Sequence, residues 1–312
     1  MAAKPGSLIY QIQESNKPNT LTVKQVGTSS ALGSGYTNLT PIVVKGQTYL
    51  LGYNPTAKNF DVFEFSTTAP WLNAVAAKPG IQSGLTIIEP CVIGNHVAIA
   101  GYEPKKGIFY LYSMADDLAT SKKPVEFFRN HEPSLSQGFS TVKSFVSLGQ
   151  VVYLGYNITN GYVAMYTLSV TATSPPDAPP LTMTPAWAHN WAPGWTRFAF
   201  FQFGGENFFL KTNIAKPNVN IDHILDGLST GTTEVGTHLD LTDAQKLSLV
   251  EPFYLGNGDP YFVTYLSSGK VTLYRFHSDC LGWTQVASLT SKSGATQMVP
   301  LMTGGKVFLL IQ

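Results

Sequence analysis

The sequence predicts an all-β fold in which six four-stranded sheets close into a ring, that is, a six-bladed β-propeller. Three observations support this prediction. The chain repeats a unit of about 50 residues, and each copy predicts strands separated by turns rich in Gly and Asn. The last copy is completed by residues at the N-terminus. Pairing of the two ends of a chain within one sheet is typical of a closed propeller.

The clearest copy of the repeat extends from Gln137 to Leu168. It predicts strands over Ser140–Ser147, Gln150–Tyr156 and Gly161–Leu168, with a Leu-Gly turn after the first and an Asn-Ile-Thr-Asn-Gly loop after the second. The stretches that begin at Ser34 and Ser83 resemble it at a regular offset.

The register of the repeat is set by a hydroxyl residue and an aromatic residue 26 positions later, in the third strand. In the last copy the hydroxyl residue is Thr296, and the count reaches Tyr10 if it continues from Gln312 to Met1. The N-terminus therefore supplies the third strand that the C-terminus lacks. The first five pairs are Thr37 with Phe63, Thr86 with Tyr112, Ser140 with Tyr166, Thr196 with Asp222, and Ser248 with Tyr274, so that Asp222 is the exception.

The six predicted blades follow from this register and fill residues 1–312 as one domain. Blade one combines Ser7–Gln13 and Thr20–Val26 with Thr296–Thr303 and Lys306–Gln312, and the other blades cover Thr37–Val75, Thr86–Arg129, Ser140–Trp187, Thr196–Leu241 and Ser248–Thr290. Blade four carries a long proline-rich excursion that excludes a helix. Its tip, Ser174–Pro180, is predicted to be an exposed extended loop.

Composition narrows the partners and the compartment. Only 12% of the residues are charged and the net charge is +1, so nothing indicates binding to nucleic acid. No apolar run approaches the roughly 18 residues of a membrane span. The N-terminus lacks the apolar region of a signal peptide, which predicts a cytoplasmic protein or a mature secreted form. Cys91 and Cys280 are predicted to be buried, unpaired thiols.

No known catalytic motif is present: the sequence contains no GxSxG, HExxH, P-loop or CxxC pattern. The histidines fall at unrelated positions of the repeat, which argues against a shared metal site. We therefore predict neither a metal nor a cofactor. The six are His96, His131, His189, His223, His238 and His277.

Charged residues that do not recur between blades are the strongest indication of a site. Glu89, Lys143, Arg197 and Glu251 lie near the start of four consecutive innermost strands, on the face opposite to an apolar row. Charges are rarely buried unless they are paired or functional. Two interpretations remain open: two acid–base pairs that close the neck of the channel, or a ligand site.

Aromatic residues supply further candidates. Trp187, His189, Trp191 and Trp195 precede Arg197 and suggest an aromatic wall beside its guanidinium, although Trp195 alone also suits packing between blades. The loops after the second strands carry Tyr53, Tyr102 and Tyr156, either as ligand contacts or as blade-packing residues. These loops share one face with the loops that enter the innermost strands. We call it the entrance face, and in propellers generally ligands bind there.

The architecture and size of the chain resemble the six-bladed fucose-lectin-like propellers. Those lectins repeat an Arg, a Glu and a Trp between successive blades, which gives several equivalent sugar sites. The three arginines of this chain, Arg129, Arg197 and Arg275, form no repeating row, and Trp71 and Trp283 are isolated. The resemblance thus implies sugar binding as one function, without the repeated motif.

Some fungal proteins of this lectin-like architecture are similar to cofactor-free cyclases, including hetero-Diels–Alderases. This resemblance implies one asymmetric pocket in which Arg197 or Lys143 polarises a carbonyl while Glu89, Glu251 and the aromatic residues hold the ligand. We expect a protein with one small-molecule site, and the resemblance implies such a cyclase of natural-product biosynthesis. A carbohydrate-binding lectin is the alternative, and a scaffold that binds a protein through its loops is a third.

Overall fold

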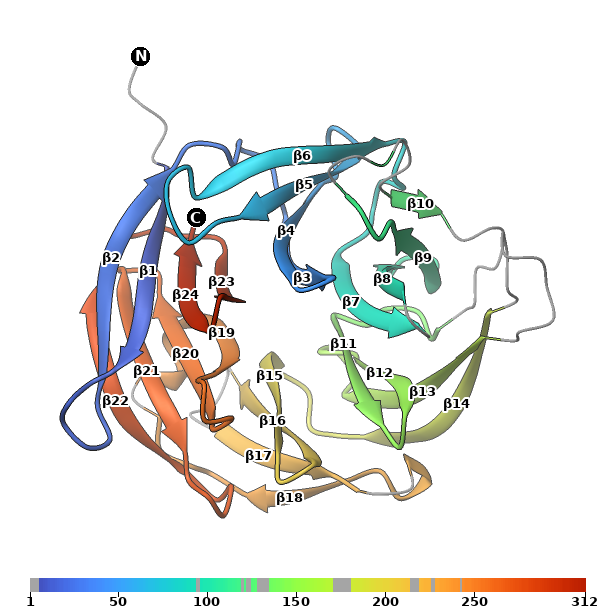
Figure 1. Cartoon of the computed structure of the whole chain (residues 1–312). Helices are drawn as coiled ribbons and strands as arrows, with labels where there is room; N and C mark the ends of the chain where they lie inside the picture. Colours follow the sequence, from blue (N-terminus) through green and yellow to red (C-terminus); the bar gives the residue numbers. More distant parts are fainter. Residues whose placement is uncertain are drawn as a thin grey trace.

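The computed structural model describes residues 6–93, 96–118, 121, 125–127, 135–170, 181–213, 219–225, 228–241 and 243–312. In these residues the chain forms six antiparallel four-stranded sheets arranged around a central axis (Figure 1). The prediction of a six-bladed β-propeller is confirmed. None of the described residues belongs to a helix long and apolar enough to cross a membrane.

The first three blades follow the predicted boundaries closely. Blade one contains β1 (Ser7–Glu14), β2 (Leu21–Ser29), β23 (Met298–Thr303) and β24 (Lys306–Ile311). Blade two contains β3 (Asn38–Val44), β4 (Gln47–Asn54), β5 (Asn59–Phe65) and β6 (Leu72–Pro79). Blade three contains β7 (Ile87–Ile93), β8 (His96–Glu103), β9 (Ile108–Met114) and β10 (Val125–Phe127). Its predicted end, Arg129, lies outside the described residues.

The remaining blades have the same layout. Blade four contains β11 (Thr141–Ser147), β12 (Gln150–Tyr156), β13 (Tyr162–Val170) and β14 (Leu181–Asn190). Blade five contains β15 (Trp195–Phe203), β16 (Glu206–Asn213), β17 (Val219–Ile224) and β18 (Thr232–Gly236). Blade six contains β19 (Leu247–Tyr254), β20 (Pro260–Leu266), β21 (Lys270–Phe276) and β22 (Trp283–Thr290). Two short 3-10 helices are present: η1 (Leu228–Thr230) lies between β17 and β18 of blade five, and η2 (Ala244–Lys246) lies in the connection from blade five to blade six.

Blade four differs from the prediction at its fourth strand. The predicted blade ends at Trp187, whereas β14 begins directly after the predicted loop tip and continues to Asn190. A proline is tolerated there because β14 is the outermost strand of its sheet, and the register shift opposite Pro185 accommodates it. The predicted loop tip, Ser174–Pro180, lies outside the described residues.

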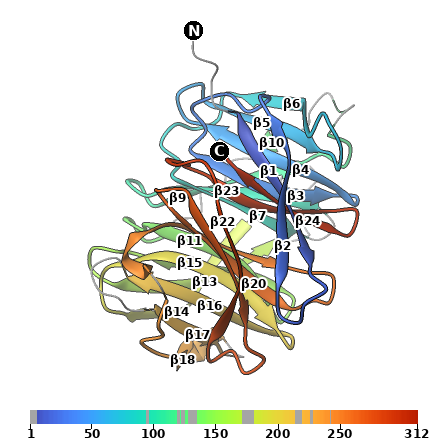
Figure 2. The same cartoon turned by 90° about the vertical axis from the view of Figure 1, so that its left-hand side faces the viewer.

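The ring closes through blade one, as the register predicts. The N-terminal strand β1 pairs with the C-terminal strand β24, from Leu8 opposite Ile311 to Ile12 opposite Val307. In both views the blue strands β1 and β2 therefore lie beside the red strands β23 and β24 (Figures 1 and 2). The two ends of the chain hold each other in one sheet.

The aromatic residue of the repeat coincides with a β-bulge. In five of the six blades the register between the third and fourth strands shifts immediately before this position. A bulge increases the local twist of the outer strand, as the curvature of a blade requires. The aromatic side chains at this position are buried; they are Tyr10, Phe63, Tyr112, Tyr166 and Tyr274.

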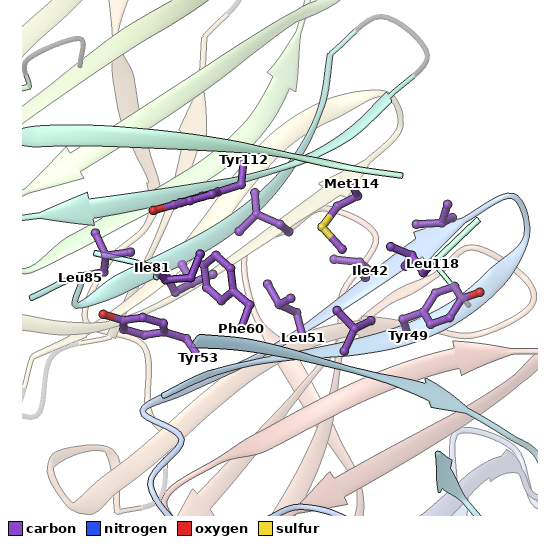
Figure 3. Close-up of a cluster of buried hydrophobic side chains, with 14 of the residues drawn as sticks. Ile42, Tyr49, Leu51, Tyr53, Phe60, Ile81, Leu85, Tyr112, Met114 and Leu118 are labelled. Atoms are coloured by element: carbon purple, nitrogen blue, oxygen red, sulfur yellow. The ribbon is translucent and has the colours of Figure 1, made fainter. Parts of the chain in front are cut away.

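The hydrophobic core lies between the blades. Between blades two and three, Leu51 and Phe60 face Tyr112 and Met114 (Figure 3). The rings of Phe60 and Tyr112 meet edge to face, with their centroids 5.1 Å apart. Such layers between blades leave only the edges of the innermost strands to line the central axis. The predicted free thiols of Cys91 and Cys280 are both buried and unpaired.

Candidate functional site

The innermost strands of the six blades are β3, β7, β11, β15, β19 and β23, and they surround the central axis (Figure 1). We call the region along this axis between the strands the channel. Polar side chains connect neighbouring strands: the Thr40 hydroxyl donates to the carbonyl of Ile88 (3.3 Å), and the Ser144 hydroxyl donates to that of Pro90 (2.8 Å). The apolar row predicted to face away from the site is buried in every blade; it comprises Leu39, Ile88, Val142, Phe198, Val250 and Met298.

The structure brings the four predicted charges, Glu89, Lys143, Arg197 and Glu251, together along the channel. Lys143 Nζ lies 2.8 Å from Glu89 Oε1, which is one of the two pairs expected if the charges merely closed the neck. The second pair is not formed: among the described residues, no ion pair within 4.0 Å involves Arg197 or Glu251. Arg197 donates from Nη1 to the backbone carbonyl of its neighbour Thr196, and its Nε is buried without a partner.

The surroundings shift the pKa values of these charged groups in different directions. Burial lowers the pKa of Lys143, but the negative charges of Glu89 and Glu251 and the hydrogen bond to Glu89 outweigh it and raise the pKa above its ordinary value. Burial lowers the pKa of Arg197, and Glu251 offsets part of that effect. Burial raises the pKa of Glu251 to about 7, against the attraction of Lys143 and Arg197 and with the repulsion of Glu89.

The raised pKa of Glu251 has a consequence for stability. A carboxyl whose pKa is higher in the folded state stabilises the fold most at low pH, and that contribution is lost as the pH rises from about 4.5 to about 7. We expect Glu251→Gln to become more stable relative to the parent over this range, by up to about 3 kcal/mol at pH 8. Urea denaturation at pH 5 and pH 8 measures the difference, with the exposed Glu14→Gln as control. A difference that does not change with pH would contradict the expectation.

Three predicted ligand contacts are structural. Tyr53, Tyr102 and Tyr156 are fully buried, so a ligand cannot touch them, and the predicted binding role is replaced by that of a clamp between blades. Blade six has the same clamp in Tyr265. Each hydroxyl donates to a backbone carbonyl in the loop that leads to the next blade: Tyr53 to Gln82 (2.6 Å), Tyr102 to Ser136 (2.6 Å), Tyr156 to Ala192 (2.9 Å) and Tyr265 to Lys292 (2.8 Å).

The predicted aromatic wall beside Arg197 is not formed as expected. Trp187 and His189 belong to β14, the outermost strand of blade four, and three inter-strand spacings separate β14 from β11 at the channel. At about 4.8 Å per spacing this is roughly 14 Å. His189 is exposed and stacks on Trp187, with ring centroids 5.8 Å apart. The prediction ended blade four at Trp187 and therefore did not place His189 in the outermost strand.

The other two tryptophans surround a lysine that the sequence did not single out. Lys211 Nζ lies 4.4 Å from the ring centroid of Trp191 and 4.8 Å from that of Trp195. The same ammonium pairs with Asp222 Oδ2 at 2.8 Å and with Glu234 Oε1 at 3.1 Å. The side chains of Lys211 and Asp222 are each only 1% exposed, so this charge network is part of the core between blades four and five.

One signal in the sequence could have revealed Lys211. Lys211 lies opposite Phe198 in the neighbouring strand. Blades two to four carry a glycine at the position that corresponds to Lys211. A Cβ on those glycines would lie less than 3.0 Å from the side chain that precedes the innermost strand. In blade five Trp195 takes the place of that side chain, a lysine replaces the glycine, and Asp222 replaces the aromatic residue. The glycines are Gly52, Gly101 and Gly155, and their neighbours are Tyr36, Leu85 and Phe139.

A large aromatic cavity opens on the opposite mouth of the channel from the one predicted. We call this the exit face, because it carries the turns between first and second strands, such as Gly204–Gly205 and Asn257–Asp259. The cavity has a volume of about 700 Å³ and none of its described lining comes from the entrance loops. Its aromatic lining comes from blades four, five and six: Phe145, Phe200, Phe201, Phe203, Phe208 and Tyr254.

The cavity and the charges lie close together along the strands. Lys143 directly precedes Ser144 and Phe145 of the cavity wall, and Glu251 lies three residues before Tyr254. No three His, Cys, Asp or Glu side chains among the described residues gather into a metal site; His131 is outside these residues. The arrangement therefore combines an aromatic cavity with the side-chain cations and carboxyls of the channel, which come earlier on the same strands.

Comparison with known proteins identifies the architecture. No protein-family model matches the chain, and no curated protein matches it. A candidate 6-phosphogluconolactonase from Bacteroides fragilis shares 15% identity over 98% of this chain and 87% of its own, with a TM-score of 0.54. A second, from Bacteroides uniformis, shares 12% over 99% and 89%, with a TM-score of 0.55. A triple arginine-to-alanine mutant of AofleA from Arthrobotrys oligospora shares 9% over 91% and 80%, also with 0.55. At these identities the likeness establishes the propeller fold alone.

Proposed function

We propose that this propeller binds one small, largely apolar organic molecule per chain, in the aromatic cavity at the exit mouth. The observation that carries the proposal is the asymmetry of the cavity. Phe200 occupies a repeat position where the other blades have proline or serine, so the fold does not require an aromatic residue there. The corresponding residues are Pro41, Pro90, Ser144, Pro252 and Pro300.

The lining suits a flat, unsaturated molecule. The rings of Phe145 and Phe200 are nearly parallel, with centroids 5.9 Å apart, and aromatic pairs favour such offset arrangements. The polar side chains at the rim already make hydrogen bonds within the protein: Gln202 donates to Asn207, and Asn207 donates to the carbonyl of Val146. A ligand would therefore gain mainly from contact with the aromatic surface, as in most small-molecule sites.

The finer part of the proposal is a cofactor-free cyclisation. A pericyclic ring closure redistributes electrons within the substrate, so it needs no oxidant, reductant or nucleophile. The protein would hold the reacting parts in one geometry, which can supply roughly 7–11 kcal/mol. Arg197 is the favoured polarising group, because its buried Nε has no partner, whereas Lys143 is engaged by Glu89.

The binding proposal is tested with 1-anilinonaphthalene-8-sulfonate, which combines aromatic rings with one anionic group. We expect calorimetric titration to give one site per chain. Phe200→Ser, which borrows the residue of blade four, should lower the affinity roughly tenfold through lost aromatic contact. Pro300→Ser changes the same repeat position in blade one and should have no effect. Equal affinities of the two variants would overturn the proposal, and L-fucose at three or more sites per chain would establish a lectin instead.

The role of Arg197 is tested by replacing it with glutamine, the residue that blade one carries at the matching position. At the matching position of blade one, Gln297 bonds to the backbone of the next blade at Thr37 and Leu39, so Arg197→Gln should fold normally. Loss of a charged hydrogen bond should cost about 1.5–3 kcal/mol, or roughly ten- to a hundredfold in binding of the sulfonate probe. A lower melting temperature with unchanged affinity would assign Arg197 to the neck alone.

Polarisation has a separate readout in the absorption band of 4-phenyl-3-buten-2-one. A hydrogen bond to this enone's carbonyl oxygen moves the band to longer wavelength. We expect the bound enone to show this shift with the parent protein and with Arg197→Lys, and not with Arg197→Gln. A shift that persists in Arg197→Gln would contradict polarisation by this residue while leaving the binding proposal intact.

A further inference from the structure

A second cavity, of about 370 Å³, lies at the exit face beside the aromatic one. It is formed by blades two, three and four, and its walls are aliphatic, with Ile42, Val43, Val92, Val97 and Val151 among them. Its one hydroxyl group, on Ser144, is already used in a hydrogen bond to a backbone carbonyl. The walls thus offer almost only hydrocarbon surface.

The two cavities share part of their lining. Ser144, Phe145 and Val146, at the end of β11, border both of them. Phe145 packs against Phe200 on the aromatic side, while Val92 and Val97 lie on the aliphatic side. A molecule seated in the aromatic cavity therefore has its edge at the opening of the aliphatic one.

We propose that the ligand of this protein has two parts, a flat aromatic head in the larger cavity and an aliphatic hydrocarbon arm that extends past Phe145 and Val146 into the smaller one. This inference rests on the proposed function for the head and adds the second part. The common wall favours one molecule with two parts over two separate ligands, because joining the parts avoids a second loss of translational freedom.

The lining also argues against a peptide as the occupant. An extended peptide can bind an exposed sheet edge by adding a strand, which requires backbone N–H donors on the edge. Pro41 and Pro90 stand in the innermost strands β3 and β7 at this cavity and have no N–H to offer. A peptide backbone in the cavity would leave its own polar groups unpaired, which is costly, whereas a hydrocarbon chain has none.

The exposed valines are consistent with a surface that is covered when the ligand binds. Val43, Val92 and Val146 are 54%, 56% and 48% exposed, and they occupy the same repeat position on three consecutive blades. Met302 occupies that position in blade one with 49% exposure, but it lines neither cavity. The chain therefore provides its own control for a substitution in the aliphatic cavity.

The first test measures the affinity of phenol, 4-butylphenol and 4-octylphenol by calorimetry. Each buried methylene should raise the affinity roughly three- to fourfold until the smaller cavity is filled. Val92→Asn should flatten this dependence on chain length, while Met302→Asn should keep that of the parent. A dependence that is equal in both variants would overturn the arm. Binding of phenol that is weakened by Phe200→Ser would leave the head site standing in that case.

The second test uses the two cysteines. Cys91 lines the aliphatic cavity, whereas Cys280 lies in blade six and lines neither cavity. Burial raises the pKa of the Cys91 thiol to about 11, so only a small fraction is the reactive thiolate at pH 8.5. Labelling with N-ethylmaleimide at this pH is therefore slow enough for its rate to be followed. We expect 4-octylphenol, but not phenol, to slow the labelling of Cys91 at least tenfold relative to Cys280, as followed by peptide mass spectrometry. Unchanged labelling would overturn the proposal, and so would protection that depends on protein concentration alone, which would identify a second copy of the chain as the occupant.

Discussion

A chain that lacks Val307–Gln312 should lose its cooperative unfolding transition. These residues form nearly all of β24, which pairs with β1 on one side and with β23 on the other, so their removal opens the ring. The side chains from Val307 to Ile311 are all 5% exposed or less. At about 1.5–3 kcal/mol for each buried apolar side chain, the loss is on the order of 10 kcal/mol, which is comparable to the whole stability of a typical domain.

Thermal unfolding followed by circular dichroism measures this effect. Lys306→Ala is a suitable control, because it changes an exposed side chain of the same strand and should unfold like the parent within about 0.5 kcal/mol. If the truncated chain melted within a degree or two of the full chain, the pairing of the two termini would not hold the ring together. An intermediate result, with one blade melting early, would show that the remaining blades stay closed without β24.

The fold was predictable because two positions of the repeat keep a constant spacing along the sequence. The spacing of 26 residues connects the hydroxyl residue with an aromatic residue in five of the six copies and with Asp222 in blade five, since the position lies at the bulge of the third strand, where the side chain faces the neighbouring blade. Loops vary in length without disturbing this spacing, because they lie outside the strands. Closure through Tyr10 followed from the same count.

The charged part of the site was also visible in the sequence. Glu89, Lys143, Arg197 and Glu251 depart from the repeat, and the alternation of side chains along a strand placed them on one face. What the alternation does not give is which charges meet. Two features depend on the twist between blades and on side-chain reach: the pairing of Lys143 with Glu89, and the lack of an ion pair to Glu251 within the described part of the chain.

The aromatic residues that the sequence analysis selected do not line the aromatic cavity, for a physical reason. The three tryptophans are conspicuous because they lie close together in the sequence, but β14 carries Trp187 to the outer edge, and Trp191 and Trp195 close over Lys211. The cavity instead collects Phe145, Phe200 and Tyr254 from three separate blades. Residues so far apart in the chain form a cluster only when blades four, five and six pack side by side.

The network around Lys211 shows how blade five departs from the repeat without losing its core. The ammonium is held by Asp222 on one side and by the faces of Trp191 and Trp195 on the other. The charged groups gain hydrogen bonds and cation–π contacts, which offset the free energy of taking them out of water. Glu234 is 46% exposed at the edge of the network, so it can return to water more readily than Asp222.

Lys211→Ala should therefore destabilise the fold by about 3–5 kcal/mol, because it leaves the carboxylate of Asp222 buried without its partner. The double variant Lys211→Met with Asp222→Leu should recover most of this loss, since apolar groups of similar volume replace the whole pair. Urea denaturation at pH 8 measures both free energies of unfolding. A single variant within about 1 kcal/mol of the parent, or a double variant no more stable than the single one, would contradict this account.

The same pair should show a dependence on pH in the direction set by its carboxyl. Burial raises the pKa of Asp222 to about 6 while Lys211 lowers it, so removal of the lysine must raise it further. A carboxyl with a raised pKa contributes stability at low pH that is lost as the pH rises through that value. The cost of Lys211→Ala should accordingly shrink as the pH falls from 8 to 5 and Asp222 takes up a proton. The cost of the double variant should not shrink, because it has no carboxyl at this position to take up a proton.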